Sequence, residues 1–202
     1  MGIAATDVER IFRESGAFLE GHFLLASGRH SPTYLEKFHV LQWPDRTERL
    51  CASIAERVRD LGAETVAGPT TGGIILAHEV ARQLGTRAVY AERAESGTGR
   101  VFRRGFQLRR GERVLVVDDI MSTGGSVEET IAAVRAAGGH VVGAAVLVDR
   151  SGGAARTMGV PLVALWEVTM QSYAADACPQ CASGEPLAKP GTTPAPNMEV
   201  RT

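Results

Sequence analysis

Two adjacent carboxylates followed by small polar residues form the part of the sequence best suited to chemistry. Within Val114–Ser126, which reads VLVVDDIMSTGGS, Asp118 and Asp119 follow four apolar residues, and the loop Met121–Ser126 comes next. Backbone N–H groups of a loop that opens a helix can converge on a phosphate, because the helix N-terminus carries a partial positive charge. The stretch therefore predicts a phosphate-binding loop with two acids at its edge.

The two acids require a ligand that separates them from the phosphate, since like charges repel. A sugar 5-phosphate meets this requirement if its phosphate lies in the loop while Asp118 and Asp119 accept hydrogen bonds from ribose hydroxyls. Gly124 and Gly125 permit a curled backbone and close approach of the ligand. The loop has neither the Gly-Lys-Ser/Thr of a P-loop nor the G-x-G-x-x-G of a dinucleotide site. A helix-capping and turn cluster at a strand end is the alternative reading of the acids.

The surrounding segments predict the elements that must position this loop. Apolar runs indicate strands over Glu64–Ala67, Arg87–Ala91, Arg113–Val117, Val141–Val148 and Leu162–Trp166. Helical spacing of apolar residues indicates helices over Thr6–Arg13, Thr47–Leu61, Ile74–Leu84 and Val127–Ala137. Such alternation is typical of an α/β protein whose central parallel sheet has helices on both faces and binds ligands beyond the carboxyl ends of its strands.

Two segments depart from this alternation. Glu92–Gln107 is long, polar and rich in Gly and Arg, and a loop of this length in a compact domain is usually functional or mobile. A solvated β-hairpin extension is the alternative. Residues 189–202 contain three prolines among small polar residues, which predicts a disordered tail after a single domain over residues 1–188.

Composition narrows the class of protein. A formal net charge of −1 gives no electrostatic reason to expect nucleic acid or an anionic membrane as partner. The longest clean apolar stretch, Val141–Val148, is too short to span a bilayer, and the N-terminus carries acids where a signal peptide has an apolar run. Three cysteines cannot all pair, which favours a reducing compartment. We therefore expect a cytoplasmic protein without a membrane partner.

Five segments resemble a known family in register. Val114–Ser126 is similar to the signature of type I phosphoribosyltransferases, which bind 5-phosphoribosyl 1-diphosphate (PRPP). Glu20–Tyr34 resembles the N-terminal segment of orotate phosphoribosyltransferases, and Gly68–Gly73 resembles their pyrophosphate loop. Leu147–Arg150 is similar to their later strand ending in arginine, and Cys178–Leu187 to a C-P-x-C tail of one bacterial branch.

The resemblance implies a type I phosphoribosyltransferase fold with a small N-terminal hood over about residues 1–45. It also implies a homodimeric pentosyltransferase that moves ribose 5-phosphate from PRPP to N1 of orotate in de novo pyrimidine biosynthesis. The products would be orotidine 5′-monophosphate and pyrophosphate. Because pyrophosphate leaves as positive charge develops on the ribose, Mg²⁺ and basic side chains must stabilise the leaving group. The resemblance implies Mg²⁺ held mainly through PRPP, with no protein ligand assigned.

The resemblance also assigns roles to individual residues. It implies that Asp118, Asp119 and Arg93 are catalytic, and that Ser122 and Arg150 hold the orotate carboxylate, Arg150 in bidentate fashion. A purine site would not need Arg150, for which a surface ion pair with Asp149 or nearby acids is the alternative role. The implied PRPP-binding set is Thr71, Gly72, Arg93, Asp118, Asp119, Ile120, Met121, Ser122, Thr123, Gly124, Gly125 and Ser126.

The chain departs from the family at positions that face pyrophosphate. Ala26 and Gly72 stand where many members have lysine, and Glu92–Gln107 contains neither Lys nor His. Arg93 matches a basic position of the family, and we expect it to replace the lysines together with a later arginine of this loop, acting across a dimer interface. The later candidates are Arg100, Arg103 and Arg104. Two alternative functions remain: a PRPP-binding regulatory protein without turnover, and a phosphoribosyltransferase for another base.

The cysteines and histidines give no complete metal motif. Cys178 and Cys181 have zinc-ribbon spacing, but the sequence contains no second pair. We expect a plain C-terminal turn there. The histidines show no ligand spacing, and structural roles are expected for all of them, namely His22, His30, His39, His78 and His140.

Overall fold

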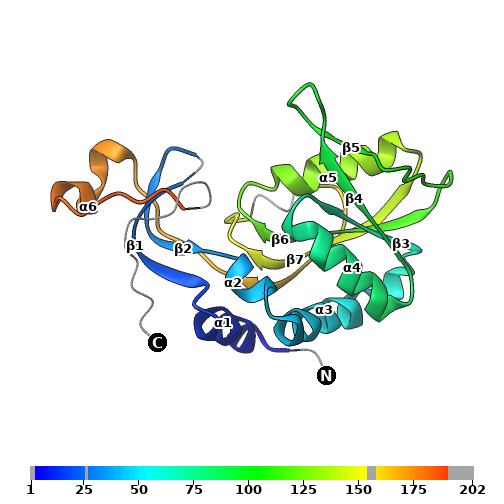
Figure 1. Cartoon of the computed structure of the whole chain (residues 1–202), viewed down its shortest axis with the longest axis horizontal. Helices are drawn as coiled ribbons and strands as arrows, with labels where there is room; N and C mark the ends of the chain where they lie inside the picture. Colours follow the sequence, from blue (N-terminus) through cyan, green and yellow to red (C-terminus); the bar gives the residue numbers. More distant parts are fainter. Residues whose placement is uncertain (1–2, 26, 154–157, 191–202) are drawn as a thin grey trace.

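A six-stranded sheet forms the body of the protein, and a smaller two-stranded hood stands beside it (Figure 1). The computed structural model describes residues 3–25, 27–153 and 158–190. The strand order is β5-β4-β3-β6-β7-β8, and every neighbouring pair is parallel except β4 and β5. The strands are β3 (Thr65–Pro69), β4 (Arg87–Arg93), β5 (Arg100–Phe102), β6 (Arg113–Met121), β7 (His140–Asp149) and β8 (Leu162–Glu167). This architecture confirms the predicted fold class.

Helices cover both faces of the sheet, as the alternation of residues along β6 requires. Leu115 and Val117 pack with the helices of one face, whereas Val114 and Val116 pack with α5 on the other. The first face is covered by α1 (Ala5–Glu14), α3 (Pro44–Val58) and α4 (Gly72–Leu84), and the second by α5 (Gly125–Ala136). These four residues of β6 are fully buried, so the strand forms the centre of the core.

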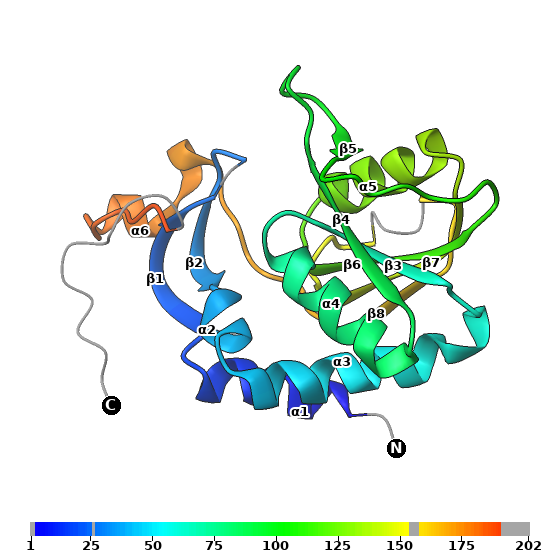
Figure 2. The ribbon, with the colours of Figure 1, turned by 45° about the vertical axis from the view of Figure 1, so that its right-hand side comes forward.

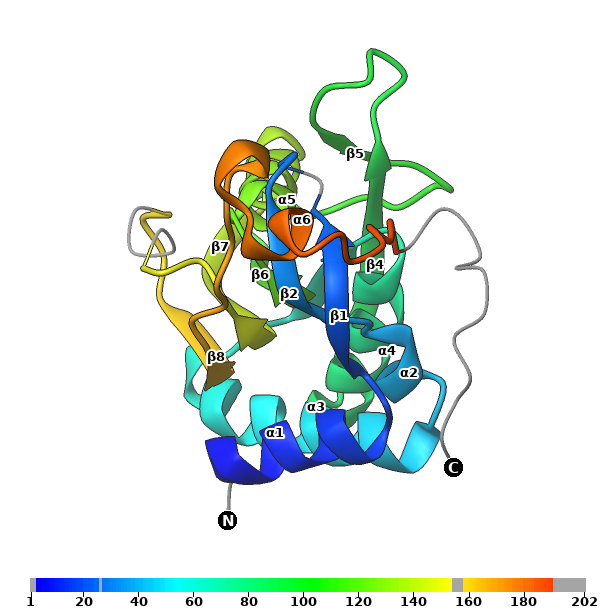
Figure 3. The ribbon, with the colours of Figure 1, turned by 90° about the vertical axis from the view of Figure 1, so that its left-hand side faces the viewer.

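The hood is an antiparallel pair of β1 (Phe18–Leu24) and β2 (His30–Leu35). The C-terminal segment returns to both of its edges. Tyr173 exchanges backbone hydrogen bonds with His30 at 2.8 and 2.9 Å, and the Ala188 carbonyl accepts from Leu24 at 2.8 Å. Between these points, η3 (Ala175–Ala177) and α6 (Pro179–Ala182) lie against the hood (Figure 3). The short helix α2 (Phe38–Leu41) leads from the hood to the body (Figure 2).

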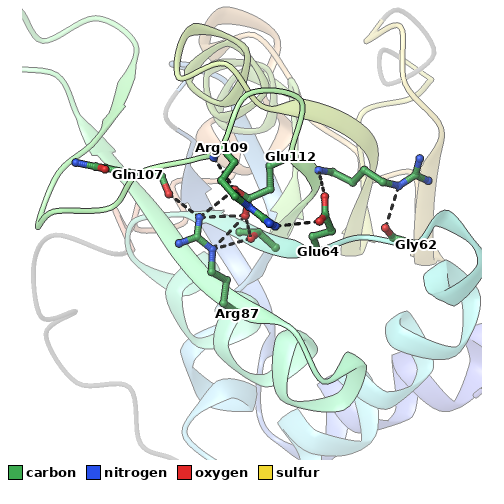
Figure 4. Close-up of polar contacts among 8 residues, drawn as sticks. Gly62, Glu64, Arg87, Gln107, Arg109 and Glu112 are labelled. Atoms are coloured by element: carbon green, nitrogen blue, oxygen red, sulfur yellow. Dashed lines mark hydrogen bonds and ion pairs between the residues drawn. The ribbon is translucent and has the colours of Figure 1, made fainter.

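A buried charged network ties the amino ends of β3, β4 and β6, opposite the carboxyl ends of these strands (Figure 4). Glu112 is 3% exposed and accepts hydrogen bonds from the Thr65 hydroxyl, the Arg87 guanidinium and the Arg109 backbone N–H. Burial alone would raise the pKa of Glu112, but these donors hold it below its usual value. Removing one of these partners would leave the buried charge of Glu112 without compensation and destabilise this end of the sheet.

Element boundaries differ from the predictions in ways that matter for the site. The strand β6 continues to Met121, so Asp118 and Asp119 lie within the strand and not after it. The helix α4 begins at Gly72, because β3 continues to Pro69 and leaves only two residues between strand and helix. The segment Glu92–Gln107 contains β5, whose Arg100 pairs with Arg93, so its base is an antiparallel hairpin. Hairpin pairing was the alternative reading of this segment.

Other predicted elements are confirmed, and part of the chain is not described. The helix α3 starts at Pro44, because proline suits the first helical turn. It ends at Val58, and the 3-10 turn η1 (Arg59–Leu61) carries the helical segment on to Gly62, where the predicted helix was expected to end. The strand β2, the helix α2 and the small C-terminal helices were not predicted. Ala26 and nearly all of the predicted disordered tail lie outside the described residues, so the tail stays a prediction. Among the described residues, no helix is long and apolar enough to cross a membrane.

Candidate active site

The predicted phosphate loop surrounds a cavity of about 130 Å³ at the carboxyl end of β6. Its lining consists of Asp118, Ile120 and the residues from Met121 to Val127. The helix α5 begins at Gly125, and the N–H groups of its first turn have no partner within the helix. Gly124 caps this helix with a φ of +87°, and a Cβ there would lie 2.4 Å from the Met158 methyl group. The loop therefore lines a small cavity at a helix N-terminus, which is the place where backbone N–H groups bind a phosphate.

The strand places the two acids on different sides of this loop. Asp118 lines the cavity, whereas Asp119 points toward the start of α4, where a Cβ on Gly72 would lie 2.0 Å from Asp119 Oδ2. The side chains are 7% and 5% exposed. Each is anchored by a backbone N–H, that of Asp119 to Asp118 Oδ1 at 2.8 Å and that of Ile120 to Asp119 Oδ1 at 2.6 Å. The predicted residues Thr71 and Gly72 thus adjoin the acidic pair.

Burial changes the charge state of the acids. Desolvation raises the pKa of Asp118 to about 7, and the neighbouring charge of Asp119 adds to the rise. Desolvation also raises the pKa of Asp119, but the ammonium group of Lys37 opposes that rise. Two buried carboxylates with raised pKa values are characteristic of a site that receives hydrogen-bond donors or cations from a ligand.

Lys37 is a site residue that the sequence reasoning missed. It follows β2 in the hood, and its Nζ lies 3.6 Å from Asp119 Oδ1. Two signals could have found it: it is one of only two lysines in the chain, and it comes three residues after the family segment ends at Tyr34. The contact itself depends on how the hood folds over the sheet, which no local pattern reveals.

The structure brings together Arg150 and Ser122, as the resemblance implied. Met121 pairs with Asp149 across β6 and β7, so Arg150 emerges beside the phosphate loop. Its Nε donates to Ser122 Oγ at 2.7 Å. Within the described part of the chain, Arg150 forms no ion pair, and Asp149 Oδ1 instead accepts from the Ser151 N–H at 2.7 Å. Burial lowers the pKa of the Arg150 guanidinium, because a half-buried cation loses part of its hydration. An anion that paired with it would restore that stabilisation.

The loop arginines have different surroundings. Arg103 pairs with Glu95 at 3.1 Å and Arg104 with Glu92 at 2.9 Å. Arg93 is exposed at the end of β4, and none of the described acids forms an ion pair with it. Arg93 is therefore the arginine of this segment whose charge is free for a ligand.

Arg100 is not a mobile loop cation. It is 8% exposed and donates to the Thr70 hydroxyl at 3.2 Å and to the Ser126 hydroxyl at 3.4 Å. Its Nε lies 3.3 Å from Glu129 of α5. Because these partners belong to the β3–α4 turn and to the phosphate loop, Arg100 holds the two loops at a fixed spacing. The structure thus supports a positioning role for Arg100, and the expectation that it contacts pyrophosphate stays a prediction.

Two larger hollows lie away from the phosphate loop. One of about 810 Å³ runs beside β7 and β8 and is lined by Asp149 and Glu167, but by none of the predicted site residues. The other, of about 400 Å³, is apolar and lies between α3 and α4, with Leu41, Ile74 and Ile75 in its lining. The polar groups able to bind a sugar phosphate are at the smaller cavity.

Comparison with known proteins agrees with this geometry. A family model for the phosphoribosyl transferase domain matches residues 40–175. The chain is 50% identical over 186 residues to an orotate phosphoribosyltransferase of Pelotomaculum thermopropionicum, covering 92% of this chain and 96% of the relative. An orotate phosphoribosyltransferase of Acidithiobacillus ferrooxidans is 44% identical over 193 residues, covering 94% and 98%.

Solved structures show the same likeness. The crystal structure of an orotate phosphoribosyltransferase from Aeropyrum pernix has a TM-score of 0.68 at 30% identity, covering 80% of this chain and 93% of that chain. An adenine phosphoribosyltransferase from Rhodothermus marinus has a TM-score of 0.62 at 23% identity, covering 81% of this chain and 99% of that chain. The second likeness extends to the fold alone.

Proposed function

The chain belongs to the orotate phosphoribosyltransferase family, and from this membership we propose which residues bind each part of its two substrates. The enzyme transfers ribose 5-phosphate from PRPP to N1 of orotate, with orotidine 5′-monophosphate and pyrophosphate as products. One observation supports the residue assignments most directly: the guanidinium of Arg150, which pairs with none of the described acids, donates from Nε to Ser122, a residue of the phosphate loop itself. A carboxylate-bearing base and a sugar phosphate can therefore bind side by side.

The 5-phosphate of PRPP binds in the cavity formed by Met121–Ser126. The ribose hydroxyls donate to the carboxylates of Asp118, which lines the cavity, and of the neighbouring Asp119. Burial raises the pKa values of both acids, because the charged carboxylates have lost water as a hydrogen-bond partner. Ribose hydroxyls would replace that water as donors, which supports the assignment.

The orotate carboxylate binds between Arg150 and Ser122. Arginine presents a planar pair of N–H donors that matches a carboxylate, and the contact from Nε to Ser122 fixes the plane of the guanidinium. A purine carries no carboxylate for this pair, which explains the preference for orotate.

The leaving pyrophosphate needs positive charge. Mg²⁺ fits the donors present, since PRPP supplies hard oxygens beside the carboxylates, and the ion would offset the charge of the diphosphate when bound through PRPP. The residues that assist it are Lys37, from the hood, and Arg93, at the end of β4. Gly97 and Gly99, at φ +78° and +75°, allow the hairpin that follows Arg93 to close over the site.

The enzyme acts as a cytoplasmic homodimer, and we place the contact at the apolar hollow between α3 and α4. Ile75 lines this hollow and is 36% exposed, and Phe38 and Trp43, near the lining residues Leu41 and Pro44 in the chain, are 40% and 48% exposed. A contiguous exposed apolar patch marks an interaction surface. Because α4 begins at Gly72, a partner bound there would lie beside the site and could supply its Arg93. All three cysteines are free, in keeping with a reducing cytoplasm.

The loss of orotate absorbance with PRPP and Mg²⁺ tests the assignment, with uracil, adenine, hypoxanthine and xanthine as competing acceptors. We expect turnover with orotate alone. Turnover with another base would overturn the role of Arg150. No turnover with any base, together with measurable PRPP binding, would favour a regulatory protein that has kept the site.

A further inference from the structure

Four metal-ligating side chains meet between the hood and the C-terminal segment, away from the phosphate loop. His22 comes from β1, His30 from β2, Cys178 from the residue before α6, and Cys181 from α6 itself. One ligand atom of each lies within 4.8 Å of all the others. The histidines and cysteines are about 150 residues apart in the chain, so only the folded structure reveals the group.

The spacing of these atoms matches the corners of a tetrahedron. His22 Nε2 lies 3.0 Å from His30 Nδ1, 3.5 Å from Cys178 Sγ and 3.7 Å from Cys181 Sγ. Cys181 Sγ lies 3.2 Å from His30 Nδ1. Zinc bound at about 2.0–2.1 Å to nitrogen and about 2.3 Å to sulfur needs ligand atoms roughly 3.3–3.8 Å apart. These four separations lie within about 0.3 Å of the tetrahedral values, and the remaining two, both from Cys178 Sγ, are at most 4.8 Å, so a small shift of Cys178 completes the site.

The surroundings prepare His22 as a ligand. Its Nδ1 lies 2.9 Å from the carbonyl oxygen of Glu185, which can only accept a hydrogen bond. The ring proton therefore resides on Nδ1, and the lone pair of Nε2 faces the other three side chains. His22, His30 and Cys178 are 3%, 5% and 4% exposed, whereas Cys181 is exposed and provides the route of entry.

We propose that His22, His30, Cys178 and Cys181 bind one structural Zn²⁺ that fastens the C-terminal segment to the hood. Both thiols lose their protons on binding, so two thiolates balance the charge of the ion. Four protein ligands leave no open position, which distinguishes a structural site from a catalytic one.

The consequence for the fold follows from where the segment is attached. Backbone pairing holds it at Tyr173 and at Ala188, and the zinc ligands lie between these two points. The hood in turn carries Lys37, which contacts Asp119. Loss of the ion would therefore lower the stability of the hood. Turnover would fall less than stability, because the ion affects the site only through the position of Lys37.

The test is the metal content of the full chain, purified without chelator and reconstituted with zinc. Elemental analysis by inductively coupled plasma mass spectrometry should find about one zinc ion per chain. Replacement by Co²⁺ should give the intense visible bands of tetrahedral cobalt and a thiolate-to-cobalt band in the near ultraviolet. Removal of the zinc should lower the melting temperature, and its return should restore it.

Variants locate the site. Cys181→Ser changes an exposed ligand and should fold, yet lose the thiolate band and most of the zinc, as should His30→Gln. The matched controls Cys51→Ala and His140→Gln change a cysteine and a histidine outside the cluster and should keep one zinc each. Reconstituted protein without stoichiometric zinc, equal loss in the controls, or a Cys178–Cys181 disulfide after anaerobic purification would overturn the proposal.

Discussion

The ammonium group of Lys37 lies 3.6 Å from a carboxylate oxygen of Asp119, and this contact joins the hood to the central strand of the body. Asp119 is almost fully buried, whereas Lys37 is about one-third exposed. The charge of Lys37 opposes the rise that burial imposes on the pKa of Asp119. A lysine therefore stands at the site of an enzyme that has none at position 26 or 72.

Replacing Lys37 should impair the use of PRPP. Lys37→Gln is expected to lower kcat/KM for PRPP by about ten- to a hundredfold, because a preorganised cation near the leaving diphosphate is lost. Steady-state kinetics with each substrate varied in turn would measure this. Lys189→Gln changes the only other lysine and should have no effect, and Lys37→Arg should recover part of the loss. A normal PRPP dependence in Lys37→Gln would remove the residue from the site.

The acidic pair should be indispensable for turnover. Asp118→Asn combined with Asp119→Asn is expected to abolish activity and to weaken PRPP binding, since two charged acceptors for the ribose hydroxyls are lost. Calorimetry with PRPP and the orotate assay would measure the two effects separately. Unchanged kinetics would mean that the acids serve only as a turn cluster.

The buried carboxyl group of Asp118 should lower the free energy of unfolding of the ligand-free enzyme at neutral and alkaline pH. Its pKa rises from 3.8 to about 7 on folding, so the folded state binds the proton more tightly than the unfolded chain. Stability is therefore lost as pH rises from about 4 to about 7 and stays low above that range. Asp118→Asn should raise the melting temperature at pH 8 and change it little at pH 5.

Thermal unfolding of the wild type, Asp118→Asn and the exposed control Asp60→Asn across this pH range would measure the effect. A melting-temperature difference that does not depend on pH would show that Asp118 carries no such penalty.

Arg150 should determine affinity for orotate. Arg150→Ala is expected to raise KM for orotate by about a hundredfold while KM for PRPP changes little, because a half-buried cation that binds a carboxylate is removed. Arg150→Lys should recover only part of the affinity, since lysine cannot form the bidentate contact. Equal changes in both KM values would argue that Arg150 does not bind the orotate carboxylate.

The predictable parts of the protein are those that a short stretch of sequence defines. The apolar run Val114–Val117, the two acids and the small polar residues identified the central strand and the phosphate loop, because strand, ligand loop and helix follow one another in the chain. Arg150 is 28 residues away from Ser122 in the chain, so only the family resemblance predicted that the two act together. The structure brings them together because β6 pairs with β7 and Met121 lies opposite Asp149.

The remaining features depend on long-range packing. The contact between Lys37 and Asp119 requires the hood to close on the sheet, and β5 is too short to be recognised before its pairing with β4 is known. Arg100 was therefore treated as a loop cation, although it links the two ligand loops. The cluster of His22 with Cys178 was missed for the same reason, since its members come from opposite ends of the chain.

Arg93 should act in the site of the partner subunit. Arg93→Ala is expected to lower kcat by about a hundredfold, because no acid in the described parts of the chain pairs with Arg93 at the end of β4 and positioned cations can stabilise a leaving diphosphate. Mixing the weakly active Arg93→Ala variant with the inactive double variant Asp118→Asn, Asp119→Asn distinguishes action within one subunit from action across the dimer. If Arg93 reaches across, each mixed dimer regains one complete site, because the Arg93→Ala subunit keeps its acids and receives Arg93 from its partner. If Arg93 acts within its own subunit, both sites of the mixed dimer stay defective. The orotate assay after unfolding and refolding the mixture, with each variant refolded alone as control, would measure the recovery; no recovery despite dimer exchange would place Arg93 in its own site.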